Sequence, residues 1–508
     1  MAETPRAYGG WQTEKSAWFG ELSGTGFTLV ATAVLTASIP LYTGTAAAAL
    51  VCLPLAALLI GAAYGRVYGL TADQWAVLAF RHHLAVARRQ NVFLSGVFAP
   101  TKRSTGERPM DLPGALARLR ILPAPDGRAG KIGVVHNPAT NTYTGIMQVS
   151  HGGLALVDTE LRNRRVDAWG GVLRAMCVEG GPIVRVAVHQ RCMPDDGAAL
   201  DTWTAQHIAP DAPPAAVAAL TELMAGAGPS ATTRETYVAI TIAASRVRQD
   251  VRGAGGGQVG AAAVLVREMA STEELLAGAG LMVTNRLAPR EVAGVIRSAY
   301  DPEEHVVAAS RRAAAALTDW TGGQPGVPPE LAGPAAAEAG WGSYRHDGAV
   351  SVTYHVTDLP RLDVLATVLQ PLMRPRATAR RCMTLTYEPL PPRRAKKELS
   401  RERTKRSSAR TLRAKTGRVS SVDEEREDQR AVEQDVARAD GQGVARMTML
   451  CAVTVTDPAE LDRACSDLQA DGAKAALTLR RAWGAQDDAF AAAALPLALG
   501  LPDRRGLI

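Results

Sequence analysis

The sequence predicts an α+β protein: a two-helix transmembrane hairpin near the N-terminus, followed by a cytoplasmic body of two sandwich-like strand and helix units. Three observations predict this fold class. Residues 22–65 contain no charged side chain. From residue 111 onward, segments with strand-like alternation of apolar residues are interspersed with segments of helical spacing. A Gly- and Pro-rich stretch at 322–334 interrupts these segments, and the same kinds of segment recur beyond it.

The uncharged stretch is too long for one membrane crossing. As a single helix it would be about 66 Å long, whereas the hydrocarbon core of a bilayer is about 30 Å thick. We therefore expect one span at 26–41 and a second at 46–64, with an interfacial turn between them. Two alternatives are a hairpin buried in a soluble core and a secretory signal with its apolar region at 27–39. Arg6 and Lys15, balanced by three glutamates, make a poor start for a signal peptide.

Basic residues beside the spans predict the orientation of the hairpin. The turn carries no Lys or Arg, whereas six basic residues follow the second span, namely Arg66, Arg81, Arg88, Arg89, Lys102 and Arg103. Because Lys and Arg are retained on the cytoplasmic side, we expect a multi-pass protein of the inner (cytoplasmic) membrane with both termini in the cytoplasm. Residues 1–25 then form a cytoplasmic segment. Residues 65–110 form a juxtamembrane region with an amphipathic helix at 70–91 and a polar linker.

The body is expected to contain a first α+β unit at 111–321 and a second at 335–508, joined by the linker at 322–334. Alternation predicts strands in the first unit at 142–149, 154–157, 183–189 and 237–243, with a helix at 158–178. The second unit is predicted to have strands around 350–356, 383–387, 447–455 and 475–480, with helices at 362–369 and 458–470. Each unit is expected to be a sheet with helices on one side.

The net charge of +7 is concentrated in one segment of the second unit. Residues 391–420 contain twelve Lys and Arg against two Glu, and residues 421–440 contain eight acidic residues against three Arg. Residues 391–440 contain too few apolar side chains to form a core, and this stretch is therefore predicted to be an inserted helical segment. The two halves either pair with each other or leave the basic half free to bind an acidic protein surface, anionic lipid or DNA. The candidate interaction residues are Arg393, Arg394, Lys396, Lys397, Arg401, Arg403, Lys405 and Arg406.

Motifs for enzyme chemistry are missing from the sequence. The Gly-Lys-Ile tripeptide at 130–132 lacks the Ser or Thr of a nucleotide-binding P-loop. A G-x-G-x-x-G match at 255–260 is separated from the preceding strand by a charged stretch, so it is predicted to be a surface loop. The six cysteines are scattered without a C-x-x-C pair and are predicted to be reduced thiols. We therefore expect no enzyme activity, catalytic residue, cofactor or metal ion.

Short stretches spread over most of the chain resemble a known group. They are YGGW at 8–11, WFGELSG at 18–24, DLPG at 111–114, GVVH at 133–136, TYTG at 142–145 and MPDD at 193–196. With the two spans, they resemble a family of actinobacterial integral membrane proteins encoded with conjugation genes. The start is similar to the PrgI-type small subunit of Gram-positive conjugation. The body resembles the amino-terminal domain of VirB-type secretion ATPases without the motor domain.

This resemblance implies a split arrangement, in which a separate ATPase docks on a membrane-bound platform. The expected function is a non-enzymatic inner-membrane subunit of a conjugative, type IV-like secretion system that anchors and positions this ATPase. Expected partners are the ATPase, other membrane subunits, membrane lipid and, by direct contact, nucleic acid, within an oligomeric complex. The alternatives are a membrane subunit of a type VII-like secretion system and a membrane-tethered enzyme with a deep polar pocket.

Overall fold

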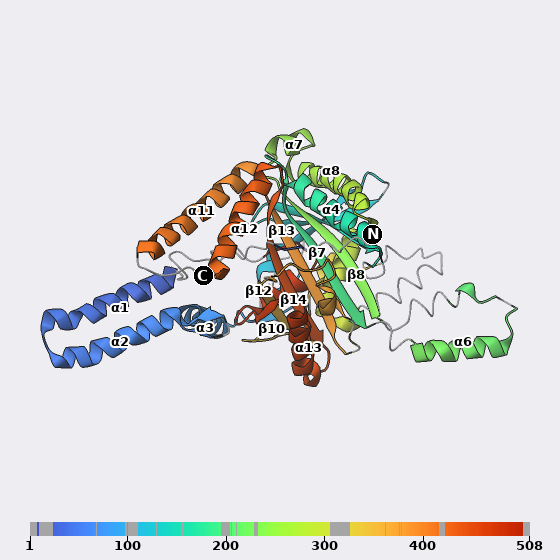
Figure 1. Cartoon of the computed structure of the whole chain (residues 1–508). Coiled ribbons are helices and arrows are strands. Elements are labelled where there is room, and N and C mark those ends of the chain that lie inside the picture. Colours follow the sequence, from blue (N-terminus) through green and yellow to red (C-terminus); the bar gives the residue numbers. More distant parts are fainter. Residues whose placement is uncertain are drawn as a thin grey trace.

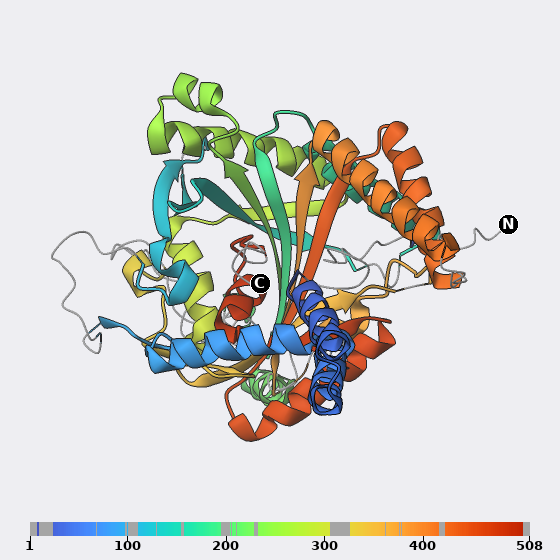
Figure 2. The same cartoon turned by 90° about the vertical axis from the view of Figure 1, so that its left-hand side faces the viewer.

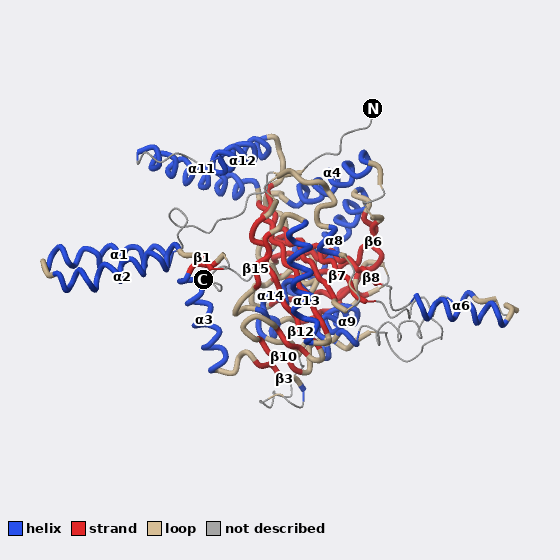
Figure 3. Tube along the Cα trace, turned by 60° about the horizontal axis from the view of Figure 1, so that its bottom comes forward, coloured by secondary structure: helices blue, strands red, loops and turns tan. Residues whose placement is uncertain are grey.

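The computed structural model has a large twisted sheet at the centre of the body and helices that project from it on two sides (Figure 1). It describes residues 8–9, 24–67, 69–96, 99, 110–128, 130–153, 157–194, 204, 206–209, 211–227, 232–304, 326–360, 362–374, 376, 378–415 and 422–500. A helical hairpin of α1 (Gly24–Thr43) and α2 (Ala46–Tyr64) extends from one side of the body. Helix α6 (Pro214–Ala227) extends from the opposite side, as Figure 3 also shows.

The hairpin agrees with the predicted pair of spans. The second helix has the predicted bounds, and the first is two residues longer at each end than predicted. Gly44, between them, has a φ of +64°, a backbone conformation that glycine adopts without strain. Both helices are long and apolar enough to cross a membrane, which suggests membrane association. Only 11% of the most apolar window of each helix is buried, so the hairpin is not part of the core of the described body.

The first unit of the body is a four-stranded antiparallel core with two crossover helices. Its elements are β6 (Thr142–His151), α4 (Thr159–Met176), β7 (Ile183–Pro194), β8 (Thr232–Ala243), α8 (Gly257–Gly278) and β9 (Leu281–Arg286). The strands lie in the order β9, β6, β8, β7, which is fourth, first, third, second along the chain. This order is that of a ferredoxin-like βαββαβ unit.

The second unit repeats this topology. Its elements are β12 (Ala349–Asp358), β13 (Arg380–Leu390), β14 (Val444–Val455), α13 (Leu461–Lys474) and β15 (Thr478–Arg481). The strand order β15, β12, β14, β13 again runs fourth, first, third, second. The first crossover differs, because a short 3-10 turn (Gln370–Met373) stands where the first unit has α4. The body is therefore built from two copies of one topological unit.

The two units share one sheet. Strands β7 and β13 pair antiparallel from Arg381 opposite Cys192 to Tyr387 opposite Val186, which joins the units edge to edge. The first unit is extended by β4 (Arg120–Pro125) and β5 (Lys131–Asn137). The second is extended by β3 (Val92–Leu94), β10 (Ala336–Ala339) and β11 (Tyr344–His346). Thirteen strands of the described part of the chain thus form one sheet, where two separate sheets were expected.

Helices cover both faces of this sheet, so the prediction of helices on one side is wrong. On one face, Trp169 of α4 packs against Tyr387, and Asp471 of α13 pairs with Arg381. On the other face, α9 (Pro289–Tyr300) and α14 (Gln486–Ala494) form a second core with strand residues such as Ala187 and Ala239. The central strands bury both sets of alternating side chains, so each face needs a cover.

Several predicted elements differ in detail. The helix predicted at 362–369 is wrong: Val364 instead forms a β-bridge with Tyr8, and Pro371 at the start of the following 3-10 turn is incompatible with a continuing helix. Of the strand predicted at 154–157, residues 154–156 lie outside the described residues. In the linker, Val327 and Ala332 are buried in the core beside α9, which tethers its described part to the first unit. The surface loop predicted at 255–260 is confirmed only at Gly255 and Gly256, which turn between α7 (Arg248–Gly253) and α8, whereas Gly260 lies within α8 and is buried against Val251 of α7.

Each unit carries its insertion at the same topological position. Helix α6 lies between β7 and β8, whereas α11 (Pro392–Lys415) and α12 (Val422–Ala439) lie between β13 and β14. Because β7 and β13 are antiparallel, the insertions leave the sheet at opposite ends. The pair of α11 and α12 therefore extends on the same side as the α1–α2 hairpin (Figure 1).

Candidate interaction surface

All eight predicted interaction residues lie on α11. Ala395 and Leu399, one turn apart, are buried against the body and set the orientation of the helix. The opposite face exposes Arg393, Lys397 and Arg401, which follow each other at intervals of four residues. Lys396 is exposed beside this row. The side chains of Lys405 and Arg406 lie outside the described part of the chain.

Arg394 forms an ion pair within α11. The Arg394 Nε lies 3.0 Å from the Oε1 of Glu398, four residues further along the helix, and the Arg446 Nη2 of β14 lies 2.7 Å from the Glu398 Oε2. At the start of the helix, the Arg393 backbone N–H donates to the Glu179 carboxylate over 3.3 Å. Glu398 and Glu179 therefore hold the first turns of α11 to the body, and Arg394 contributes only through its pair with Glu398.

A further ion pair joins α11 to α12. The Arg403 Nη1 lies 2.6 Å from the Asp435 Oδ2, and the Asp435 Oδ1 is 3.0 Å from the Arg438 Nη2. Hydrogen bonds from Arg438 and Arg403 lower the pKa of Asp435. Arg403 therefore pairs the basic half with the acidic half, but exposed ion pairs of this kind contribute little to stability.

Four of the predicted residues stay available for a partner. Arg393, Lys396, Lys397 and Arg401 are exposed, and their side chains make no ion pair within the described part of the chain. We call these four side chains the basic row of α11. The basic row is the part of the charged insertion that can bind an anionic surface without first breaking an internal pair.

A tryptophan cluster that the sequence did not predict joins the membrane hairpin to the body. Helix α3 (Ala72–Ala87) follows α2 and carries Trp75, whose ring lies 5.7 Å from that of Trp341 and 6.1 Å from that of Trp483. Trp341 and Trp483 lie 6.4 Å apart and His82 of α3 is 5.2 Å from Trp341. The Trp75 indole N–H donates to the Val67 carbonyl, and the Arg481 guanidinium lies over the Trp483 ring. This tryptophan cluster fixes α3 to the second unit.

The sequence does contain a signal for this cluster. Trp341 and Trp483 are each followed by glycine, Gly342 and Gly484. A Cβ at Gly342 would lie 2.6 Å from the Trp483 ring, and one at Gly484 would lie 2.8 Å from the Trp341 ring. The two Trp-Gly dipeptides therefore pack reciprocally, each glycine making room for the other tryptophan.

A second connection reinforces the first. Just after α3, β3 pairs with β10 at the edge of the sheet, with Phe93 opposite Ala337. The chain that follows α2 is thus held to the body at two nearby points, by Trp75 in the tryptophan cluster and by the pairing of β3 with β10. The body has a defined position relative to the membrane hairpin.

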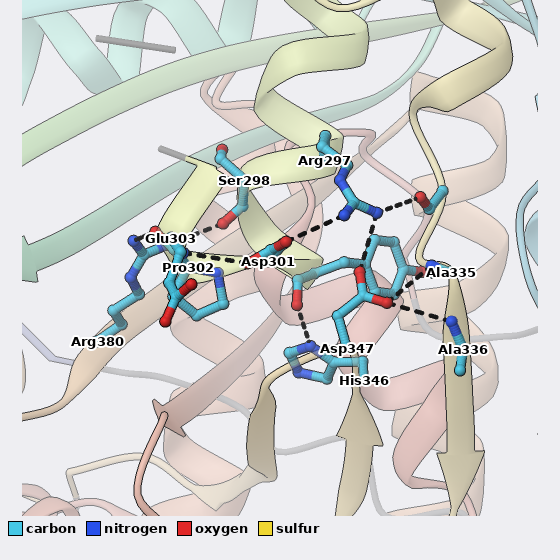
Figure 4. Close-up of polar contacts among 12 residues, drawn as sticks. Arg297, Ser298, Asp301, Pro302, Glu303, Ala335, Ala336, His346, Asp347 and Arg380 are labelled. Carbon is cyan, nitrogen blue, oxygen red and sulfur yellow. Dashed lines mark hydrogen bonds and ion pairs between the residues drawn. The ribbon is translucent and has the colours of Figure 1, made fainter. Parts of the chain in front are cut away.

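A partly buried polar cluster lies where α9 meets the second unit (Figure 4). Arg297 lies between two carboxylates, 3.0 Å from Asp301 and 2.9 Å from Asp347. Asp347 also accepts backbone N–H groups from Ala335 and Ala336. These contacts join the end of α9 to β10 and β11. Arg297, Asp301 and Asp347 therefore stabilise the packing of the two units against each other.

Beside this cluster, a buried histidine and arginine bind backbone groups. His346 lies 2.5 Å from the Tyr300 carbonyl through Nδ1 and 2.7 Å from the Ser351 hydroxyl through Nε2, and burial lowers its pKa to about 4. Arg380 donates to the Ser298 carbonyl over 2.8 Å. Each of these groups is engaged with neighbours in the protein. Within the described residues, no three His, Cys, Asp or Glu side chains are placed to hold a metal ion.

No protein-family model matches the sequence, and no curated protein matches it. Two features of the molecule itself therefore bear on its function. One is the fixed connection between the hairpin and the body, and the other is the basic row of α11.

Proposed function

We propose that the protein is a non-enzymatic membrane platform of a conjugative, type IV-like secretion system, which anchors and positions a separate ATPase at the cytoplasmic face of the inner membrane. The observation that carries the proposal is the tryptophan cluster. A flexible tether would suffice to keep a protein near a membrane, whereas a platform has to hold its body in a defined position relative to the bilayer. The contacts of Trp75 with Trp341 and Trp483 supply such a connection.

The proposed orientation places the body in the cytoplasm. The loop between α1 and α2 has no basic residue, whereas Arg66, Arg81, Arg88 and Arg89 follow α2. Lys and Arg close to a span favour the cytoplasmic side. The ATPase would then meet the body on the side of the membrane where ATP is present.

The proposed ATPase contact is the basic row of α11. Its side chains are exposed and make no ion pair with the described residues, and they lie on an insertion that leaves the sheet on the side of the α1–α2 hairpin. An acidic surface on the ATPase would complement this row, and such complementarity raises the association rate and makes binding sensitive to salt.

Charge reversal tests this contact. The triple variant R393E/K397E/R401E is compared with R248E/R252E/R267E, which reverses three exposed arginines on α7 and α8. Both proteins are purified with their apolar hairpin in nanodiscs and incubated with the separate Walker-motif ATPase that the proposal expects among the neighbouring genes. We expect the α11 variant to lose ATPase binding at low salt and the α7–α8 variant to retain it. Equal binding by both variants across a salt series would refute the proposed contact.

A further inference from the structure

Helix α3 has two faces with different environments. Trp75 and His82 lie on the face that packs on the body through Trp341. Ala76, Phe80 and Leu84 follow at intervals of four residues on the opposite face, and all three are exposed. Phe80 leaves 69% of its surface uncovered. A helix held by one face therefore presents an apolar stripe on the other.

The position of α3 indicates what covers this stripe. Helix α2 ends at Tyr64, and α3 starts at Ala72 after a two-stranded ribbon of β1 (Arg66–Val67) and β2 (Leu70–Thr71). In Figure 2 the α1–α2 hairpin is seen end-on, and α3 crosses the view at a large angle to it, in front of the body. In Figure 1 α3 lies between the end of α2 and the sheet. If α1 and α2 cross the bilayer, α3 lies along its surface.

Two basic residues lie at the C-terminal end of α3, as is typical of an interfacial helix. Arg88 caps the C-terminal end of α3 and Arg89 follows it, and both are exposed. Apolar side chains that enter the headgroup region, together with arginines beside them, are typical of helices that lie in the plane of a membrane. Anionic lipids of the cytoplasmic leaflet attract such basic residues.

We infer that α3 is an interfacial helix whose Ala76, Phe80 and Leu84 stripe inserts into the anionic leaflet beside α1 and α2, while its other face holds the body through the tryptophan cluster. The helix thereby sets the tilt of the sheet relative to the bilayer. This goes beyond the platform role, because it requires neither an ATPase nor a secretion system. A bilayer is the occupant that the connection to α2 and the flanking arginines favour over a soluble protein.

Spin-label accessibility tests the inference on the full chain in nanodiscs of phosphatidylcholine with phosphatidylglycerol. A label is attached through F80C on α3 and, as a control, through V259C on α8, where Val259 is also exposed. The unsubstituted protein is a second control, which measures how much label attaches to the protein's own cysteines. We expect oxygen to relax the label at 80 more than a water-soluble nickel complex does, and the reverse at 259. Nickel access at 80 equal to that at 259 would overturn the inference. Low access of both reagents at 80 would also overturn it, since it would show a covering protein surface.

The dependence of the depth of the label at 80 on lipid charge provides a second measurement. Replacing Arg88 and Arg89 by Gln (R88Q/R89Q) should make the label at 80 shallower in the anionic nanodiscs, because each basic residue near an anionic surface favours binding about fivefold. R248Q/R252Q is the matched control and should leave the depth unchanged. An unchanged depth in R88Q/R89Q, together with no difference between anionic and neutral nanodiscs, would overturn the role of the anionic leaflet. Because no ATPase is present, failure here is distinguishable from failure of the platform proposal.

Discussion

Removal of one tryptophan should weaken the docking of α3 on the body. In W483A, α3 loses the ring that lies 6.1 Å from Trp75. The contacts of Trp483 with Trp341 and Arg481 lie within the second unit and do not hold α3. An aromatic pair contributes about 0.5–1.5 kcal/mol, so the docked state of α3 should lose about that much. Because 1.36 kcal/mol is a factor of ten, the undocked population should rise by about twofold to thirteenfold.

Amide hydrogen exchange of α3 in nanodiscs measures this population directly. We expect exchange within α3 to accelerate in W483A, while β14 at the centre of the sheet keeps its protection, since the change is confined to the contact with the second unit. The double variant W75A/W483A should exchange faster than W483A, because W75A also removes the contact of Trp75 with Trp341 at 5.7 Å. Unchanged exchange of α3 in W483A, or equal acceleration in α3 and β14, would show that the cluster does not dock the helix.

Three further predictions concern stability, topology and chemistry. D471N leaves the Arg381 guanidinium, 2.8 Å from Asp471 and 1% exposed, without its buried partner, and should lower the free energy of unfolding by about 3–5 kcal/mol in urea titrations. Burial raises the pKa of Asp471, but hydrogen bonds from Arg381 and Lys474 lower it to about 2. The wild-type protein should therefore keep this stabilisation above about pH 4 and lose about 2 kcal/mol as the pH falls through 2, and D471N should lack that loss. A phosphatase fusion in the α1–α2 loop should be active and one after residue 103 inactive, and the reverse pattern would contradict the proposed orientation. The full chain in nanodiscs should not hydrolyse ATP, and turnover that a single substitution abolishes would favour an enzyme.

The candidate surface was predicted from the sequence as a set of eight residues, and the structure divides this set. Charge density alone placed all of them on one exposed helix. The sequence could not separate Arg403 from the rest, because its partner Asp435 lies on α12 and meets it only when the two helices are packed together. Arg394 pairs with Glu398 four residues further along the same helix, a spacing that the sequence does show. The packing of α11 against α12 and β14 decides which basic side chains of the set form ion pairs.

The tryptophan cluster was missed for a related reason. Trp75, Trp341 and Trp483 lie in three separate segments, and no local periodicity relates them. Three Trp-Gly dipeptides occur in the sequence, and those at 341 and 483 were the available signal, since a tryptophan followed by glycine suits a position where another ring packs on the backbone. The third, at 169, lies on α4 with open space beside its glycine.

By itself, the sequence determined those features that depend on local composition. The absence of charge over 22–65 specified two membrane-length helices, and alternation of apolar residues specified the central strands. Only the tertiary structure decided how these strands assemble. Alternation tells which side chains of a strand are buried but not which edge will pair with it, and β7 and β13 are buried on both faces. Their pairing merges two repeated units into one sheet, so that α9 and α14 are needed to cover its second face.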